Sequence, residues 1–297
     1  MKLNLLALML TVMQIGSVAN AQVIEVIDDR GNSIRLEQAA QRVIALAPHI
    51  VEVVYAVGKG DTLVGAVSYS DFPEAAKSIP RVGSYKDFSI ESVLRLQPDI
   101  ILAWDTGNGA DKINQLVNLG LTVYWSEPRT LEDVSKSIAD IGILLGSTSS
   151  ADLAASFDAT LTQLREQYSH KNRVSVFYQV WNSPLQTLNG EHLISDVMSL
   201  CGGHNIFYDT AALAPIVNIE SLLMSDPQVI IASGMAQERP EWLDEWLEWP
   251  QLKSVVHQQL YFIPPDIIQR HSPRILQGAS MMCDQIDRAR QVYSQYE

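Results

Sequence analysis

The chain has a deficit of basic residues, with 21 Lys and Arg against 34 Asp and Glu and a net charge of −13. Attraction to a polyanion requires an excess of positive charge, so the composition argues against partners such as nucleic acid or an anionic lipid surface. Low-complexity stretches and flexible linkers are also absent, and 47% hydrophobic with 19% charged residues is typical of a folded globular protein.

Short catalytic motifs are missing as well. The sequence contains no G-x-S-x-G nucleophile elbow and no H-E-x-x-H metal motif. A hydrolase that uses a carboxylate pair such as Asp71 and Asp266 stays open as a remote alternative, although no catalytic spacing supports it.

Only two cysteines occur, Cys201 and Cys283, 82 positions apart. In an oxidising compartment, an isolated pair is most simply one disulfide. A metal pair completed by His204 is the alternative, but the paired ligand spacing of a zinc site is missing. We therefore predict no metal site.

Residues 1–21 resemble a cleavable signal peptide. Lys2 precedes an apolar run from Leu3 to Val12, and Ala19-Asn20-Ala21 gives a small-x-small cleavage site before Gln22. A retained membrane anchor is the alternative, but the run is far shorter than the roughly 20 residues of a spanning helix. No cysteine follows the cleavage site to carry a lipid. These features predict a secreted protein.

One sequence unit occurs twice. Glu91–Ala103 reads ESVLRLQPDIILA, and Glu220–Ala232 reads ESLLMSDPQVIIA. Each copy predicts a short helix, capped by Ser89 or Asn218, which a proline ends before a strand of continuous apolar residues. Such strands are typical of parallel sheets covered on both faces, so the repeat predicts two similar lobes.

The whole pattern predicts an α/β fold with two similar doubly wound lobes and a ligand cleft between them. The lobes are residues 22–148 and 171–297, joined by one long rigid helix within 149–170 that spans roughly 27 Å. The predicted core strands are 42–46, 63–67, 100–103 and 121–125 in the first lobe, and 173–180, 229–232 and 260–263 in the second. A further helix over 241–252 carries Trp242, Trp246 and Trp249 as a packed stripe rather than a ligand cage.

Several short stretches, in this order, carry a family resemblance: Tyr69–Pro73, Ala103-Trp104, Cys201–Phe207, Asp266 to Arg274, and Cys283. With the signal peptide, the two lobes and the repeat, the chain resembles the periplasmic solute-binding proteins of ABC importers for metal chelates, haem and cobalamin. Within that group, it is most similar to the members that bind cobalamin.

The resemblance implies a monomer that binds a corrinoid between its lobes and delivers it to a two-fold membrane permease. Such a protein is not an enzyme and has no cofactor other than the transported cobalamin. It also implies that Cys201 and Cys283 form the family's disulfide. A haem or ferric-siderophore carrier on the same fold is the alternative, which would require an iron-ligating Tyr or His, or several basic residues.

Aromatic residues at strand ends are the first ligand-binding candidates. Tyr69 and Trp104 follow buried strands, where open α/β sheets bind ligands, and a flat macrocycle requires flat partners. Tyr85 occupies the position of a tryptophan in the family's N-terminal lobe. Another family tryptophan falls on Ala214, and Trp181 could replace its contact area.

Polar candidates come from both lobes. Asp266 and Arg270 are four residues apart; they either form a local ion pair or, as the resemblance implies, meet the polar edge of the ligand. His49 could bind a corrinoid amide or a haem iron, or lie in a solvated loop.

Glu91 and Glu220 begin the two copies of the repeat. An acid in the first turn is favoured by the helix dipole, which alone could explain both residues. The resemblance implies that they dock against arginines of the permease.

Overall fold

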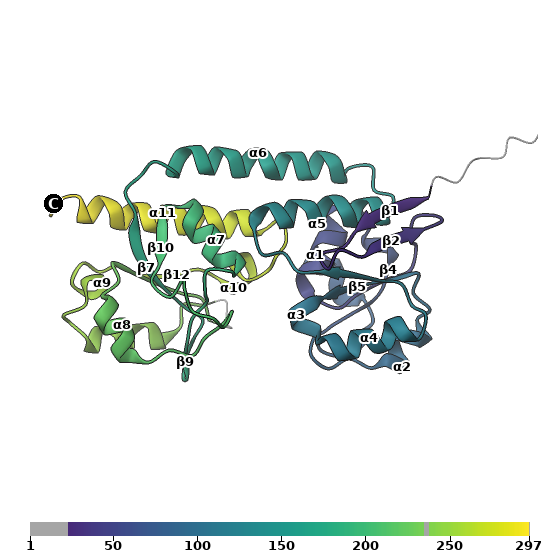
Figure 1. Ribbon diagram of the computed structural model, residues 1–297, viewed down its shortest axis with the longest axis horizontal. Helices are drawn as coiled ribbons and strands as arrows, with labels where there is room; N and C mark the ends of the chain where they lie inside the picture. Colours follow the sequence, from purple (N-terminus) through teal and green to yellow (C-terminus); the bar gives the residue numbers. More distant parts are fainter. Residues whose placement is uncertain (1–22, 235–237, 297) are drawn as a thin grey trace, which may run out of the picture.

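The computed structural model describes residues 23–234 and 238–296, which fold into two lobes (Figure 1). Each lobe is built around a four-stranded parallel sheet, with strand orders β4-β3-β5-β6 and β10-β7-β11-β12. The first sheet consists of β3 (Val43–Ala45), β4 (Leu63–Ala66), β5 (Ile100–Trp104) and β6 (Val123–Ser126). The second consists of β7 (Val174–Gln179), β10 (Gly203–Asn205), β11 (Val229–Ala232) and β12 (Leu260–Phe262). The predicted α/β class with two lobes is confirmed.

Helices and two hairpins surround these sheets. The first lobe has the hairpin β1 (Ile24–Ile27) and β2 (Ser33–Leu36), with α1 (Pro48–Ala56), η1 (Gly60–Thr62), η2 (Glu74–Ser78), α2 (Ile90–Arg95), α3 (Asp105–Asn108) and α4 (Ala110–Asn118). The second has the hairpin β8 (Trp181–Asn182) and β9 (Leu185–Gln186), with α7 (Leu193–Leu200), α8 (Ile219–Ser225), η3 (Glu241–Glu248), α9 (Lys253–Val256), α10 (Pro265–Ile268) and α11 (Ile275–Tyr293).

The repeated unit forms the same structure in each lobe, α2 followed by β5 and α8 followed by β11. Both helices have the predicted N-caps: the Ser89 side chain accepts from Ser92 N at 3.1 Å, and that of Asn218 accepts from Ser221 N at 2.8 Å. Because β5 and β11 are interior strands of their sheets, each copy places its capped helix at an equivalent point of its lobe.

One long helix connects the lobes. Figure 1 shows α6 (Ser150–Tyr168) running above α5 (Leu131–Leu144) and α11, across both lobes. Helix α5 lies within residues 129–148, for which no element is predicted from the sequence. A capping box at Thr130 and Asp133 starts α5, and its buried positions recur at helical spacing. The sequence therefore carries a local signal for this helix.

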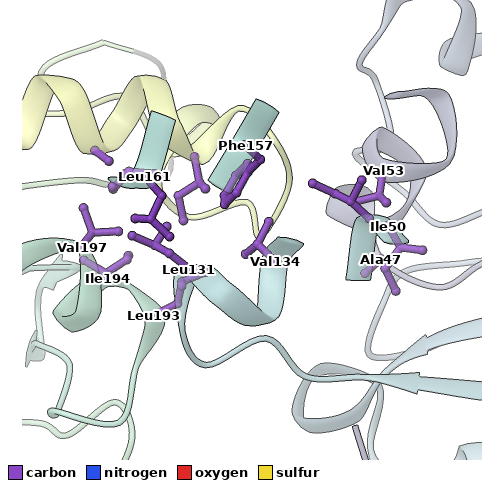
Figure 2. Close-up of a cluster of buried hydrophobic side chains, with 14 of the residues drawn as sticks. Ala47, Ile50, Val53, Leu131, Val134, Phe157, Leu161, Leu193, Ile194 and Val197 are labelled. Atoms are coloured by element: carbon purple, nitrogen blue, oxygen red, sulfur yellow. The ribbon is translucent and has the colours of Figure 1, made fainter. Parts of the chain in front are cut away.

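One of the hydrophobic clusters runs through both lobes (Figure 2). It extends from Val53 on α1 through Val134 on α5 and Phe157 on α6 to Val197 on α7. Burial of apolar side chains contributes about 25 cal/mol per Å², so a separation of the lobes at this core would be costly. The connection between the lobes is therefore stiff because its helices pack into this shared core, and not only because α6 is helical.

One local prediction differs from the structure. The tryptophan segment is the 3₁₀ helix η3 rather than an α-helix over 241–252; Trp246 is buried, whereas Trp242 and Trp249 are half-buried. Only part of this stripe is therefore packed inside the protein.

The predicted signal peptide, residues 1–21, lies outside the described residues. In residues 23–234 and 238–296, no helix is both long enough and apolar enough to cross a membrane. Cys201 at the end of α7 and Cys283 on α11 form a disulfide with a Cα–Cα distance of 4.6 Å, which ties the last helix to the second lobe.

Candidate ligand-binding site

Aromatic and imidazole rings from both lobes meet at the boundary between them. Trp104, the last residue of β5, lies 5.7 Å from Tyr85, 5.3 Å from His49 and 6.1 Å from His271, measured between ring centroids. His271 belongs to the second lobe, and its ring lies 5.2 Å from that of His49. The structure therefore brings together three predicted site residues, Tyr85, Trp104 and His49, and adds His271 from the other lobe.

Three buried ring nitrogens in this cluster have no hydrogen-bond partner in the described part of the chain. They are His49 Nε2, Trp104 Nε1 and His271 Nδ1. An unsatisfied buried polar group costs roughly 1–3 kcal/mol. The ring cluster therefore holds three polar atoms whose hydrogen-bonding capacity the protein itself does not use.

The histidines of the lobe boundary are held in the neutral form. Burial, with smaller contributions from His271 and Arg270, keeps the pKa of His49 well below its ordinary value. Burial lowers the pKa of His271 to about 4 and that of His192, whose ring lies 5.9 Å from His271, to about 3. Near neutral pH each ring therefore has one donor and one acceptor nitrogen.

Arg270 is engaged in ion pairs across the lobe boundary. Its guanidinium lies 2.7 Å from Asp266 of its own lobe, as the local-pair alternative predicts. It also lies 3.0 Å from Glu52 and 3.0 Å from Asp71, both in the first lobe. Only 13% of the Arg270 side chain is exposed, against 46% for Asp71 and 29% for Asp266. The carboxylates, rather than Arg270, form the accessible part of this group.

Glu52 is the centre of the same network and was not predicted. Its carboxylate, 2% exposed, accepts from Arg270, from Arg274 Nε and Nη2, and from Ser272 Oγ. The network thus joins α1 of the first lobe to the start of α11 in the second. An acid inside the apolar run Ile50–Val54 was the one available signal, because a buried carboxylate requires partners.

Tyr69 and Trp181 lie outside the ring cluster. Tyr69 follows β4 with a left-handed backbone (φ 65°) and is 75% exposed. Trp181 is on the β8–β9 hairpin, where its Nε1 donates to the Ser183 carbonyl at 3.0 Å. The structure therefore places both rings at the surface.

The two repeated glutamates are exposed. Glu91 is in the first turn of α2 and pairs with Arg95 at 2.7 Å, and Glu220 is in the first turn of α8. Figure 1 places α2 and α8 at the lower ends of the two lobes, opposite α6. Both helices thus face the same side of the molecule.

The sequence of both lobes matches a known protein family. The model of a family described as "Periplasmic binding protein" matches residues 43–267, which span both lobes. The chain belongs to this periplasmic binding protein family. Its periplasmic location follows from that membership, and so does its role as a solute-binding protein rather than an enzyme.

Related members of the periplasmic binding protein family include a vitamin B12-binding protein from Vibrio campbellii. It is 34% identical over 254 residues, which cover 85% of this chain and 91% of the relative. The crystal structure of the periplasmic vitamin B12 binding protein BtuF of Vibrio cholerae superposes with a TM-score of 0.78 at 35% identity, covering 84% of this chain and 98% of BtuF.

A second solved structure shows how widely the fold is shared. The periplasmic heme-binding protein RhuT from Roseiflexus sp. RS-1 gives a TM-score of 0.74 at 19% identity, covering 85% of this chain and all of RhuT. At this identity the likeness shows the fold alone. In the described ranges, 23–234 and 238–296, no group of three or more His, Cys, Asp or Glu could hold a metal ion.

Proposed function

We propose that this protein captures cobalamin, or a closely related corrinoid, between its two lobes and delivers it to the permease of an ABC importer. The observation that carries the proposal is its similarity to vitamin B12-binding proteins at 34–37% identity over more than 80% of the chain. The heme-binding neighbour is only 19% identical and shares the fold without favouring haem.

The ring cluster supports this ligand class. A corrin is a large flat macrocycle with amide side chains, and it requires both aromatic contact and hydrogen-bonding groups. Tyr85 and Trp104 supply rings, and the unpartnered nitrogens of His49 and His271 supply polar contacts for amides. Exposed Tyr69 and Trp181 provide further ring surface at the rim of the proposed site.

Asp266 and Arg270 take different parts in this proposal. Asp266 is partly exposed and accepts from a ligand amide, whereas Arg270 holds Asp266 and Asp71 in position through its ion pairs. A ligand that displaced Asp71 from Arg270 would gain the guanidinium as a partner. Asp71 therefore belongs to the proposed site although the sequence did not predict it there.

Glu91 and Glu220 are proposed to dock the carrier to a two-fold permease. Their equivalent positions on α2 and α8, on one side of the molecule, suit a partner with two equivalent basic patches. Exposed charges of this kind act mainly on association rate and specificity. We expect the carrier to reach the permease as a monomer, which sedimentation of the free protein tests.

Calorimetry with the mature protein tests the ligand. We expect one molecule of cyanocobalamin to bind per chain, and the complex to keep its visible spectrum through desalting. Haem and a ferric siderophore are titrated in parallel. The proposal is overturned if cyanocobalamin fails to bind, and a haem complex that His49→Ala abolishes would establish the alternative.

A further inference from the structure

A second concave site lies on the second lobe. It is a pocket of about 330 Å³ beyond the carboxyl end of β7, between η3, the β8–β9 hairpin and the start of α8. Its lining residues are Gln179, Asn182, Leu185, Ile219, Trp242, Glu245, Trp246, Glu248 and Trp249. In the second sheet the chain moves from β7 to β10 on one side and then to β11 on the other, and open α/β sheets bind ligands at such a switch point.

Three tryptophans line this pocket, two from η3 and Trp249 directly after it. Trp246 is buried, and its Nε1 donates to Gln179 Oε1 at 2.7 Å, which fixes the ring against the end of β7. Phe177 supports the same ring from the core at a centroid distance of 5.9 Å. Trp242 and Trp249 are half-buried and keep part of their surface open to a ligand. The aromatic lining is thus built on a fixed ring.

The charged residues that line the pocket are acidic. Glu245 and Glu248 line it, and no Lys, Arg or His is among its lining residues. Across the described residues, neither glutamate has an ion-pair or side-chain hydrogen-bond partner, whereas neighbouring Asp244 is paired with Arg239. A cation that entered the pocket would therefore meet two uncompensated carboxylates.

We propose that this pocket binds a small organic cation with a quaternary ammonium group. Such a cation is attracted to the faces of aromatic rings, most strongly to tryptophan, and it has no N–H group that requires an acceptor. Glu245 and Glu248 add a favourable charge at the rim, and the volume accommodates a group as small as choline. An anion would be repelled by Glu245 and Glu248, and no basic residue lines the pocket to offset them.

The site is independent of the proposed cobalamin function. The pocket shares no residue with the ring cluster or with the ion network of Arg270. A protein that fails to bind a cation in this pocket can therefore still be tested for cobalamin binding, and the reverse. The two proposals can thus fail separately.

The test compares two probes of the same shape, choline and its uncharged analogue 3,3-dimethylbutan-1-ol. Calorimetry and tryptophan fluorescence of the mature protein give both affinities. We expect choline to bind at least about tenfold more tightly, because only the cation is attracted electrostatically to the ring faces and to the carboxylates. Equal affinities, or no binding of choline, would overturn the proposal.

Matched variants locate the binding. We expect two variants to lower choline affinity at least about fivefold each, with cobalamin binding unchanged. They are Trp249→Ala and the double change Glu245→Gln with Glu248→Gln. Tyr296→Phe changes an exposed ring outside both the pocket lining and the proposed cobalamin site, and it is the control that leaves choline binding as in wild type. If Trp249→Ala does not fold, the double glutamate variant alone tests the proposal. Wild-type choline affinity in that double variant would contradict it.

Discussion

Glu52 and Arg274 face each other across the lobe boundary, joined by hydrogen bonds of 2.7 and 3.0 Å between a buried carboxylate and a guanidinium. Arg270 and Ser272 bind the same carboxylate, so one acid of the first lobe holds three side chains of the second. Together with the continuous core, this network fixes how the lobes sit relative to each other.

Replacement of Glu52 by Gln is expected to lower the free energy of unfolding by about 3 kcal/mol, because it leaves two arginines without their shared buried charge. Urea titration followed by circular dichroism measures the loss. Glu91→Gln removes an exposed ion pair and serves as the control, with an expected change below about 0.5 kcal/mol. Equal effects of the two changes would show that the network does not stabilise the lobe boundary.

Stability is expected to fall on acidification. The pKa of His271 is about 4 in the folded protein, below the roughly 6.5 of an exposed histidine, so the unfolded chain binds this proton first. The free energy of unfolding therefore decreases as the pH falls from about 6.5 to about 4, with His271 contributing about 3 kcal/mol. His49 and His192 act in the same direction, since their pKa values are also lowered.

His271→Phe tests the assignment by unfolding at pH 7 and pH 4.5. The variant keeps a ring against Trp104 but removes the titrating group, so its stability is expected to depend less on pH. His204→Gln changes an exposed histidine of β10 and should keep the wild-type slope. An unchanged slope in His271→Phe would refute the role of this histidine.

The disulfide is expected to stabilise the second lobe. Cys201 and Cys283 close a loop of 82 residues, for which the chain-entropy model gives about 4 to 5 kcal/mol. The double change of both cysteines to Ser should lower the melting temperature in oxidising buffer and make it insensitive to reductant. Wild-type protein that shows two free thiols after unfolding without reductant would contradict the prediction.

Cobalamin affinity is expected to depend on the tyrosines of the first lobe. Tyr85→Ala removes a ring that packs on Trp104, and a lost aromatic contact of about 2 kcal/mol corresponds to roughly thirtyfold weaker binding. Tyr69→Ala should act in the same direction. Calorimetry compares both with Tyr296→Ala, an exposed tyrosine near the chain end. Wild-type affinity in both variants would place the ligand elsewhere.

Transport is expected to require the two repeated glutamates. The double change Glu91→Arg and Glu220→Arg reverses two exposed charges and should lower cobalamin uptake while leaving calorimetric affinity intact. The control is the double change Asp158→Arg and Glu166→Arg, which reverses two exposed charges on α6, at the opposite side of the molecule. Uptake at the wild-type level in the variant with both repeated glutamates reversed would count against docking at α2 and α8.

The fold was predictable to the extent that its signals are local. The repeat, its caps at Ser89 and Asn218, and the apolar strands each depend on a few neighbouring residues, and the structure has them where they were predicted. Helix α5 had a local signal of the same kind. In contrast, η3 takes a 3₁₀ rather than an α conformation. The spacing of Trp242, Trp246 and Trp249 did not distinguish these two kinds of helix.

The sequence by itself determined the two lobes, the long connecting helix, the single cysteine pair and the exposed glutamates, because periodicity, capping and composition are properties of short segments. Only the tertiary structure decided which side chains meet. Glu52 and Arg270 are 218 positions apart, and His49 and His271 are 222 apart. Their contacts exist because the continuous core brings α1 of one lobe against the start of α11 in the other, and no local pattern records that packing.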